Sequence, residues 1–177
     1  MKITTKKGDK GETYIFGGKA IPKYDSRIEA EGALDEAVSS LGLAKAKIKT
    51  VRIKEVIRDI QKDLFKVIAE IAREKKDIPK LKERISLQDV RRLENIGNTI
   101  EKKVKTPSCF VIPGVNERSA SLHVARTVVR RAERIVAALN KKSKINPQIL
   151  AYLNRLSDLL FVLARYEEGK SDLLKYE

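Results

Sequence analysis

One stretch of the sequence constrains the fold more than any other, because its apolar residues follow the spacing of a single helix face. A spacing of i, i+3, i+4 and i+7 places side chains on one side of an α-helix. The residues that follow it here are Ile53, Val56, Ile57, Ile60, Leu64, Val67, Ile68 and Ile71. The stretch therefore predicts an amphipathic helix whose apolar face packs against other helices.

Four further segments carry the same kind of pattern. They are expected at about residues 26–48, 86–104, 117–141 and 147–168. Two of them have defined starts, since Ser86 and Asp89 have the spacing of a capping pair and Pro147 suits a first helical turn. Helices of this length joined by short loops predict an all-α fold, a five-helix bundle with a four-helix-bundle-like core.

The first 25 residues differ from the rest of the chain. They hold four of the nine glycines and show no helical period. Such a glycine-punctuated segment predicts an extended arm. We therefore expect a single domain over residues 1–177, with the arm at 1–25, the bundle at 26–168 and a C-terminal tail at 169–177.

The charge balance narrows the class of ligand without choosing one. Lys and Arg number 38 against 24 Asp and Glu, which gives a net charge of +14. An excess of this size attracts polyanions, so nucleic acid, anionic membrane surfaces and nucleoside triphosphates all remain open. A surface rich in Lys, Arg and Glu is also typical of thermophile proteins, where the charges form ion-pair networks.

Cysteine usage and hydropathy exclude several classes of protein. The single cysteine, Cys109, excludes an intrachain disulfide and a thiolate zinc cluster. No stretch approaches the ~20 apolar residues of a membrane span, and the polar N-terminus lacks the apolar segment of a signal peptide. These features predict a cytoplasmic protein that does not span or bind a membrane.

The arm contains a candidate phosphate-binding segment between Thr5 and Thr13. Gly8 and Gly11 allow backbone N–H groups to approach an anion closely, and the lysines around them would neutralise it. However, the spacing matches neither a Walker A loop nor G-x-G-x-x-G. On composition alone, a flexible solvated tail is favoured.

A second candidate site lies on the predicted helix at 117–141. Residues four apart share a helix face, so Arg126, Arg130 and Arg134 form one row, with Arg131 beside it. Guanidinium groups in a row offer bidentate donors to phosphate or carboxylate. A solvated helix face explains the same pattern, and the spacing does not decide between the two.

Three other residues have an ordinary interpretation and a functional one. Asn154 forms with Asp158, one turn away, either a hydrogen-bonding edge for a ligand or a hydrated flank. His123, the single histidine, has no triad or metal-ligand spacing around it, which favours a core or helix residue over a catalyst. Phe110 lies in a short apolar loop and is by residue type a core residue.

Several blocks of sequence together resemble a known family. They are F-G-G at 16–18, K-x-D-x-R-x-E-A-x-G-x-x-D-E at 23–36, F-V-I-P-G at 110–114, L-H-x-A-R-T-x-x-R-R-A-E-R at 122–134 and Y-L-N-R-L-S-D-L-L-F at 152–161. In this order they resemble the PduO-type ATP:cob(I)alamin adenosyltransferases from end to end. The region between about 49 and 105 adds only helix to the resemblance.

The resemblance implies an enzyme that transfers the 5′-deoxyadenosyl group of ATP to the cobalt of cob(I)alamin, giving adenosylcobalamin and triphosphate. It implies a homotrimer with ATP bound at subunit boundaries, assisted by Mg²⁺, with cobalamin as substrate and no nucleic acid partner. A reductase and a cobalamin-dependent enzyme are further partners that it leaves open.

The resemblance also assigns roles to residues. The arm would wrap the triphosphate through Thr5, Lys6, Gly8, Asp9, Gly11, Thr13 and Lys23. Arg130 would contact the nucleotide, and the same site would be lined by Arg131, Glu133 and Asn154. Asp35 would pair with Arg126 of the adjacent subunit, and Phe110 would lie against the corrinoid on the face of its lower axial ligand.

The chain departs from the family pattern at two places, and two other functions stay open. Lys7 stands where the family usually has Thr, and Val115-Asn116 follows where a second glycine is common. A basic bundle that binds nucleic acid is one alternative, although aromatic residues are only 5% and do not interleave with the basic runs. The other alternative is an ATP-binding relative that senses the cofactor without transferring the adenosyl group.

Overall fold

Five α-helices make up most of the described chain. The computed structural model describes residues 4, 6–104 and 110–169. The helices are α1 (Ser26–Lys47), α2 (Val51–Ile71), α3 (Leu87–Glu101), α4 (Glu117–Lys142) and α5 (Pro147–Glu168). The predicted all-α bundle is confirmed, and each helix lies where the periodicity predicted it to within a few residues.

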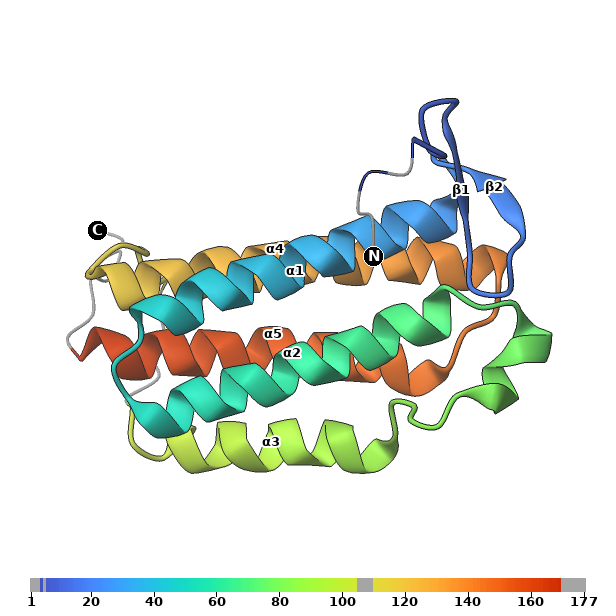
Figure 1. The fold of residues 1–177 in the computed structure, drawn as a ribbon. Helices are drawn as coiled ribbons and strands as arrows, with labels where there is room; N and C mark the ends of the chain where they lie inside the picture. Colours follow the sequence, from blue (N-terminus) through green and yellow to red (C-terminus); the bar gives the residue numbers. More distant parts are fainter. Residues whose placement is uncertain (1–3, 5, 105–109, 170–177) are drawn as a thin grey trace.

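The helices pack side by side. α1 packs against α2 and α4, and α5 packs against α4 and α3 (Figure 1). α3 forms the outer edge of this arrangement, and the N-terminal arm stands at the end of the bundle where α1 begins. Within the described ranges no helix is both long and apolar enough to cross a membrane.

The apolar face of α2 is buried as its periodicity predicted. Ile57, Ile60, Leu64 and Val67 are fully buried, and the partly buried Ile68 packs against the edge of the same core. Full burial of an aliphatic side chain of this size contributes ~1.5–3 kcal/mol. Tertiary packing of this face, more than intrinsic helix propensity, therefore stabilises α2.

The ends of α3 follow from local hydrogen bonds. Ser86 and Asp89 form the predicted capping box, in which the Ser86 N–H donates to Asp89 Oδ2 at 2.9 Å and the Asp89 N–H donates to Ser86 Oγ at 3.4 Å. The helix ends at Glu101, earlier than the expected residue 104. Beyond it the N–H groups of Lys103 and Val104 donate to carbonyls three residues back, so the chain winds into a tighter turn.

The arm and the linker behind α2 contain short elements that periodicity did not show. The extended arm folds into an antiparallel hairpin of β1 (Glu12–Tyr14) and β2 (Ala20–Pro22), in which Thr13 faces Ile21. The linker expected around Pro79 forms a short 3₁₀ helix, η1 (Lys75–Lys80). Both are too short to carry a period that sequence analysis detects.

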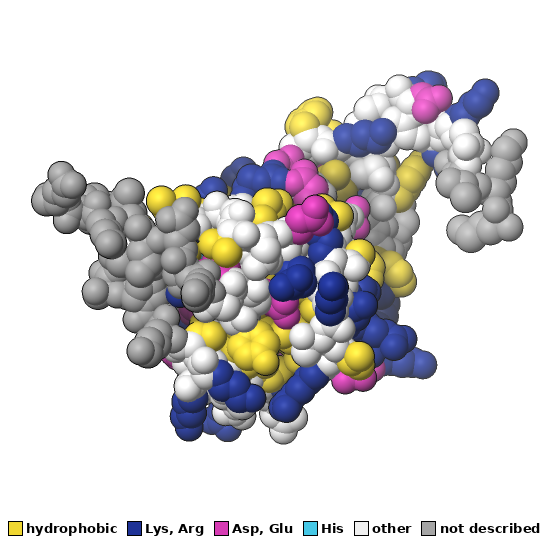
Figure 2. Space-filling view, turned by 90° about the vertical axis from the view of Figure 1, so that its left-hand side faces the viewer, with side chains coloured by type: hydrophobic (Ala, Val, Ile, Leu, Met, Phe, Trp, Pro, Cys, Tyr) yellow, Lys and Arg dark blue, Asp and Glu magenta, His cyan; other side chains and the backbone are white. Residues whose placement is uncertain are grey.

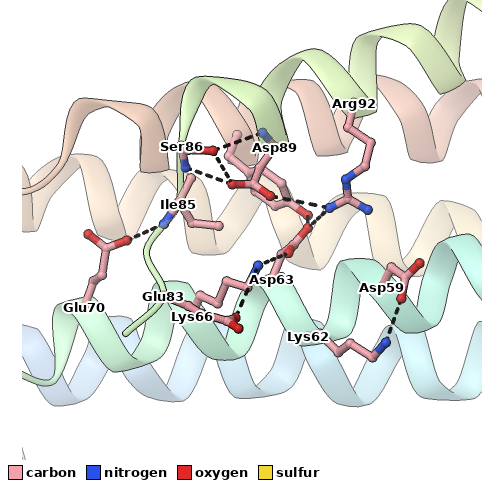
Figure 3. Close-up of polar contacts among 11 residues, drawn as sticks. Asp59, Lys62, Asp63, Lys66, Glu70, Glu83, Ile85, Ser86, Asp89 and Arg92 are labelled. Atoms are coloured by element: carbon pink, nitrogen blue, oxygen red, sulfur yellow. Dashed lines mark hydrogen bonds and ion pairs between the residues drawn. The ribbon is translucent and has the colours of Figure 1, made fainter. Parts of the chain in front are cut away.

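A buried carboxylate holds α2, α3 and α5 together. Asp63 is 2% exposed and accepts hydrogen bonds from the Tyr152 hydroxyl at 2.8 Å and from Arg92, while Lys66 Nζ lies 3.1 Å away. Figure 3 shows Asp63 and Lys66 of α2 meeting Arg92 of α3, with Asp89 beside Arg92. Burial, followed by the charge of Asp63, raises the pKa of Tyr152 well above its usual value. The region 49–105, expected to add only helix, thus supplies a charged cluster inside the bundle.

Candidate functional site

The loop before β1 is a compact series of turns. The Asp9 N–H donates to the Lys6 carbonyl at 3.3 Å, the Gly11 N–H donates to the Gly8 carbonyl at 3.2 Å, and the Lys23 N–H donates to the Gly11 carbonyl at 2.8 Å. Gly11 has a φ of 81°, a conformation that favours glycine. The predicted phosphate-binding segment is therefore folded onto the start of the chain that leads into α1.

Two of the residues predicted to bind phosphate meet in this loop. A Cβ added at Gly8 would stand 3.0 Å from the Lys23 ammonium nitrogen, so Lys23 occupies the space that a side chain at position 8 would take. Lys6 and Asp9 are exposed beside them, and Thr13 is half-buried in β1. Thr5 lies outside the described residues. The arm thus presents a cation next to a glycine backbone, as anion binding requires.

The arm is attached to the C-terminal end of α2. The Phe16 N–H donates to the Ala72 carbonyl at 3.1 Å, and the Arg73 guanidinium lies 3.5 Å from the centre of the Phe16 ring. Lys19 Nζ and the Glu74 carboxylate form an ion pair at 2.8 Å. A cation over an aromatic face and an ion pair hold the hairpin against the bundle while its loop projects beyond the helices (Figure 1).

Arg27 joins the same two parts of the chain, and sequence analysis assigned it no role. Its Nη1 donates to the carbonyls of Ile71 at 2.8 Å and Arg73 at 3.1 Å, which lie at the end of α2 and lack helical partners. Asp25 caps α1 by accepting from the Arg27 N–H at 2.8 Å. The block at 23–36 contains both residues, so the signal was present in the resemblance.

The predicted arginine row on α4 is present, but its members differ in burial. Arg130 and Arg134 are exposed, whereas Arg126 is partly buried. The Nε of Arg126 is inaccessible to solvent and has no hydrogen-bond partner among the described residues. Burial, and then the neighbouring charge of Arg130, lowers the pKa of Arg126. A desolvated guanidinium nitrogen without a partner is costly and marks a position where another group belongs.

Two other predicted site residues meet between α4 and α5. Asn154 Nδ2 donates to Glu133 Oε1 at 3.2 Å, and Arg155 Nη1 donates to Asn154 Oδ1 at 2.8 Å. Arg131, predicted to line the same site, instead forms an ion pair with Glu36 of α1. Asp158, the other half of the polar edge considered in the sequence, pairs with Arg155.

The remaining predicted residues stay apart in the single chain. Asp35 is exposed on α1 and is not paired with Arg126 or with any other residue of the described ranges. Phe110 is 71% exposed, which overturns its assignment by residue type to the core. Loops run over the surface of a protein, so a side chain in a short loop does not reach the core between packed helices. The loop that carries Phe110 lies at the opposite end of the bundle from the arm (Figure 1).

The end of the bundle near this loop carries an apolar surface. Figure 2 looks onto this end and shows hydrophobic side chains gathered in the middle, with Lys and Arg side chains around them. A groove of about 480 Å³ lies between α2 and α3, and its lining includes the apolar residues Val56, Ile96 and Ile100. None of the predicted site residues lines this groove. In the single chain the predicted site residues within the described ranges therefore lie on separate exposed surfaces and do not line one closed cavity.

The structure thus defines a helical-bundle protein with a cationic, glycine-containing arm outside the bundle and a partly buried arginine, Arg126, whose Nε has no partner in the described ranges. The chain belongs to the cobalamin adenosyltransferase family, whose profile, described as Cobalamin adenosyltransferase, matches residues 3–167. It is therefore an enzyme of the ATP:corrinoid adenosyltransferase class.

Curated relatives support this membership over nearly the whole chain. The chain is 41% identical over 172 residues to a corrinoid adenosyltransferase of Citrobacter freundii, covering 97% of this chain and 98% of that protein. It is 36% identical over 185 residues to a corrinoid adenosyltransferase of Bacillus subtilis, covering 100% and 93%. It also matches the corrinoid adenosyltransferase PduO of Salmonella typhimurium at 36% identity, covering 50% of that longer protein.

Solved structures show the same fold. A variant PduO-type ATP:corrinoid adenosyltransferase from Lactobacillus reuteri, complexed with cobalamin and ATP, superposes with a TM-score of 0.92 at 34% identity, covering 99% of this chain and 100% of that chain. Another variant of that protein, complexed with ATP, superposes with a TM-score of 0.90 at 33% identity, covering 98% and 100%.

Proposed function

We propose that this chain transfers the 5′-deoxyadenosyl group of ATP to the cobalt of cob(I)alamin, giving adenosylcobalamin and triphosphate, at sites shared by neighbouring subunits of a homotrimer. The observation that carries the shared site is the partly buried Arg126, whose Nε has no partner among the described residues. Asp35, exposed on α1, supplies the missing carboxylate when it comes from the adjacent subunit.

The arrangement of the remaining residues supports a site made by more than one chain. The arm loop with Gly8 and Lys23 projects beyond the end of the bundle, away from Arg130 in the middle of α4. The segment just before α4, which carries Phe110, lies at the opposite end of the bundle from the arm. One chain therefore separates the groups that would bind triphosphate from those that would meet the adenosyl group and the corrinoid. A second copy brings its arm to the α4 surface of its neighbour.

The chemistry suits residues of these types. Cobalt(I) attacks C5′ of the ribose with its own electron pair, a Co–C bond forms, and the C5′–O bond breaks with its electrons passing to the triphosphate. No general base is needed, because the nucleophile carries no proton. The protein must hold the two reactants in line and stabilise the charge of the leaving group. Lys23, Lys6 and Arg130 would be the cations that do so, and Mg²⁺ carried by the phosphates would add to them.

Phe110 would act on the corrinoid rather than on ATP. Its ring, which is mostly exposed in the single chain, would cover the lower face of the corrin and exclude the axial base and water from the cobalt. Removing a donor ligand makes Co(II) easier to reduce, because donors stabilise the higher oxidation state. A separate reductase would supply that electron, and we place the enzyme in the cytoplasm, where ATP and its Mg²⁺ complex are available.

The direct test is anaerobic, with purified protein, ATP, Mg²⁺ and chemically reduced cob(I)alamin. Conversion to the visible spectrum of adenosylcobalamin with one triphosphate released per cobalt is the expected result. Binding of ATP without conversion would favour the cofactor sensor. Failure of both, together with salt-dependent binding of DNA, would favour the nucleic acid interpretation.

The shared site has its own test by subunit complementation. Lys23→Ala and Arg130→Ala variants are each expected to be nearly inactive alone, since each removes one part of every site. Mixed trimers made by refolding the two together contain some sites with an intact arm from one chain and an intact Arg130 from the other, about a quarter of all sites for random assembly. Activity that stays at the level of the separate variants would place both residues in one chain's site.

A further inference from the structure

A buried charged cluster joins the last turn of α5 to the first turns of α4. His123 on α4 is 4% exposed, and its Nε2 lies 3.0 Å from Glu168 Oε1 on α5. The other oxygen of Glu168 accepts from Arg165. The His123 ring also packs against the Phe161 ring in an edge-type arrangement, with ring centres 6.1 Å apart at an angle of 64°. Because a carboxylate only accepts, Nε2 carries the proton in this contact.

A second contact holds the same two helix ends together. Arg118 Nε donates to Glu167 Oε2 at 2.8 Å, and Asn116 Nδ2 donates to the Glu167 carbonyl at 2.9 Å. Asn116 is also the N-cap of α4, since its side chain accepts from the N–H groups of Arg118 and Ser119. The residue at which α4 begins is therefore fixed to the end of α5. We refer to His123, Glu168, Arg165, Glu167 and Arg118 as the clamp.

The buried charges of the clamp are unfavourable for the stability of the fold. Glu167 and Glu168 are both buried in the last turn of α5, where the helix dipole disfavours negative charge. The buried Nδ1 of His123 has no partner among the described residues, which adds a further unfavourable term. Apolar residues in these places would avoid both penalties. The cluster therefore points to a need for a defined geometry at this corner of the bundle.

The element that depends on this geometry is the loop that carries Phe110. It runs directly into Asn116, and its residues Phe110, Ile112 and Val115 are exposed. A loop without a core of its own takes its position from the places where its ends are attached. At the α4 end that place is held by the clamp.

We infer that the clamp is a positioning device for Phe110, with His123 and Glu168 as positioning residues for the reaction. This inference rests on the proposed function, in which Phe110 covers the corrinoid. The clamp keeps the start of α4 in register with the end of α5, so that the ring of Phe110 meets the lower face of the corrin. It does not touch ATP, so its loss affects cobalt reduction and leaves nucleotide binding intact.

The test compares His123→Leu, which keeps volume and removes the contact with Glu168, against His123→Gln, whose amide nitrogen replaces Nε2. With a chemical one-electron donor and cob(II)alamin as starting material, His123→Leu slows adenosylation about tenfold or more, whereas its KM for ATP changes less than about twofold. With cob(I)alamin reduced beforehand, the loss is much smaller. His123→Gln recovers most of the rate from cob(II)alamin.

A matched control separates positioning from general stability. Tyr152→Phe removes a buried hydrogen bond to Asp63 on the other side of the bundle. It lowers the melting temperature without changing the ratio of rates from cob(II)alamin and cob(I)alamin. If His123→Leu behaves like Tyr152→Phe, the residue is merely structural and the inference is wrong.

A second readout does not depend on activity. Hydrogen exchange of the backbone amides at 110–116 accelerates in His123→Leu, while exchange at 12–22 in the arm stays unchanged. Glu168→Gln gives the same result if His123→Leu does not fold. Unchanged exchange at 110–116 in both variants would overturn the inference. Because hydrogen exchange does not require catalysis, this result is distinct from a failure of the proposed function, in which the wild-type protein would lack adenosyltransferase activity.

Discussion

The Lys23 ammonium nitrogen occupies the space beside Gly8, 3.0 Å from the point where a Cβ would stand. A methyl group at position 8 therefore displaces the end of a flexible side chain rather than the backbone. Gly8→Ala is expected to raise the KM for ATP several-fold, because Lys23 no longer lies over the loop, while the melting temperature stays nearly constant. Steady-state kinetics with varied ATP and a thermal unfolding curve measure the two quantities.

The control for Gly8 is a glycine on the opposite side of the bundle. A Cβ at Gly97 in α3 meets nothing within 4 Å. Gly97→Ala is expected to leave the KM for ATP unchanged and to stabilise the helix by ~0.5–1 kcal/mol. Equal kinetic effects of the two substitutions would show that Gly8 has no specific relation to Lys23.

The arginines of α4 offer a matched pair for nucleotide use. Arg130 and Arg134 are both exposed and lie one turn apart on the same face. Arg130→Ala is expected to lower kcat/KM for ATP by about two orders of magnitude, since a charge-assisted contact to the nucleotide is lost. Arg134→Ala should change it less than about twofold. Comparable losses of kcat/KM in the two variants would show that the arginine row acts only through its overall positive charge and that Arg130 makes no specific contact with the nucleotide.

Substitution of Phe110 is expected to affect the reaction of the corrinoid and to leave ATP binding largely intact. Phe110→Ala removes the ring that would cover the corrin, so adenosylation is expected to slow by far more than ATP binding weakens. Stopped-flow spectra of the corrinoid and a calorimetric titration with ATP give the two numbers. Equal losses in rate and in ATP affinity would contradict the assignment of Phe110 to the corrinoid.

The proposed contact between Asp35 and Arg126 of the adjacent subunit predicts an assembly defect. Asp35→Ala leaves the partly buried guanidinium of Arg126 without a carboxylate, which costs about 1–3 kcal/mol for each interface. Sedimentation velocity is expected to show dissociation of the trimer at low concentration. Double substitution of Asp35→Ala and Arg126→Leu should restore assembly in part, because it also removes the buried charge. An intact, active trimer of Asp35→Ala at low concentration removes this role.

Glu31 gives a prediction that depends on pH. Burial of its carboxyl raises its pKa, with smaller effects from Arg27 and Asp25, and its Oε1 is inaccessible and unpartnered among the described residues. A raised folded-state pKa means that the protonated form is favoured in the folded chain, so this contribution to stability is present at acid pH and is lost as pH rises through the folded pKa. Glu31→Gln should therefore raise the melting temperature at pH 7 and change it little near pH 4. Destabilisation at pH 7 would show that another subunit provides a partner for the carboxylate.

Much of the fold follows from local patterns in the sequence. The period of α2 predicted both its range and the burial of Ile57, Ile60 and Leu64. Ser86 with Asp89 marked the start of α3, because capping is decided within four residues of chain. The resemblance likewise placed Glu133 and Asn154 in one site, and the structure brings them to within 3.2 Å.

Tertiary structure decided the features that depend on residues far apart in the chain. Asp63 and Tyr152 are separated by 89 positions, and His123 and Glu168 by 45, so no spacing reveals that either pair is buried together. A helical period identifies an apolar face, but a charged residue on that face has the same appearance whether it is solvated or paired. Whether the guanidinium of Arg126 has a hydrogen-bond partner likewise depends on its neighbours in three dimensions. The sequence determined which helices form and which family the chain belongs to, because period and motif are local. Packing determined which charges are buried and which of the buried atoms lack a partner within the described ranges, because both depend on residues far apart in the chain.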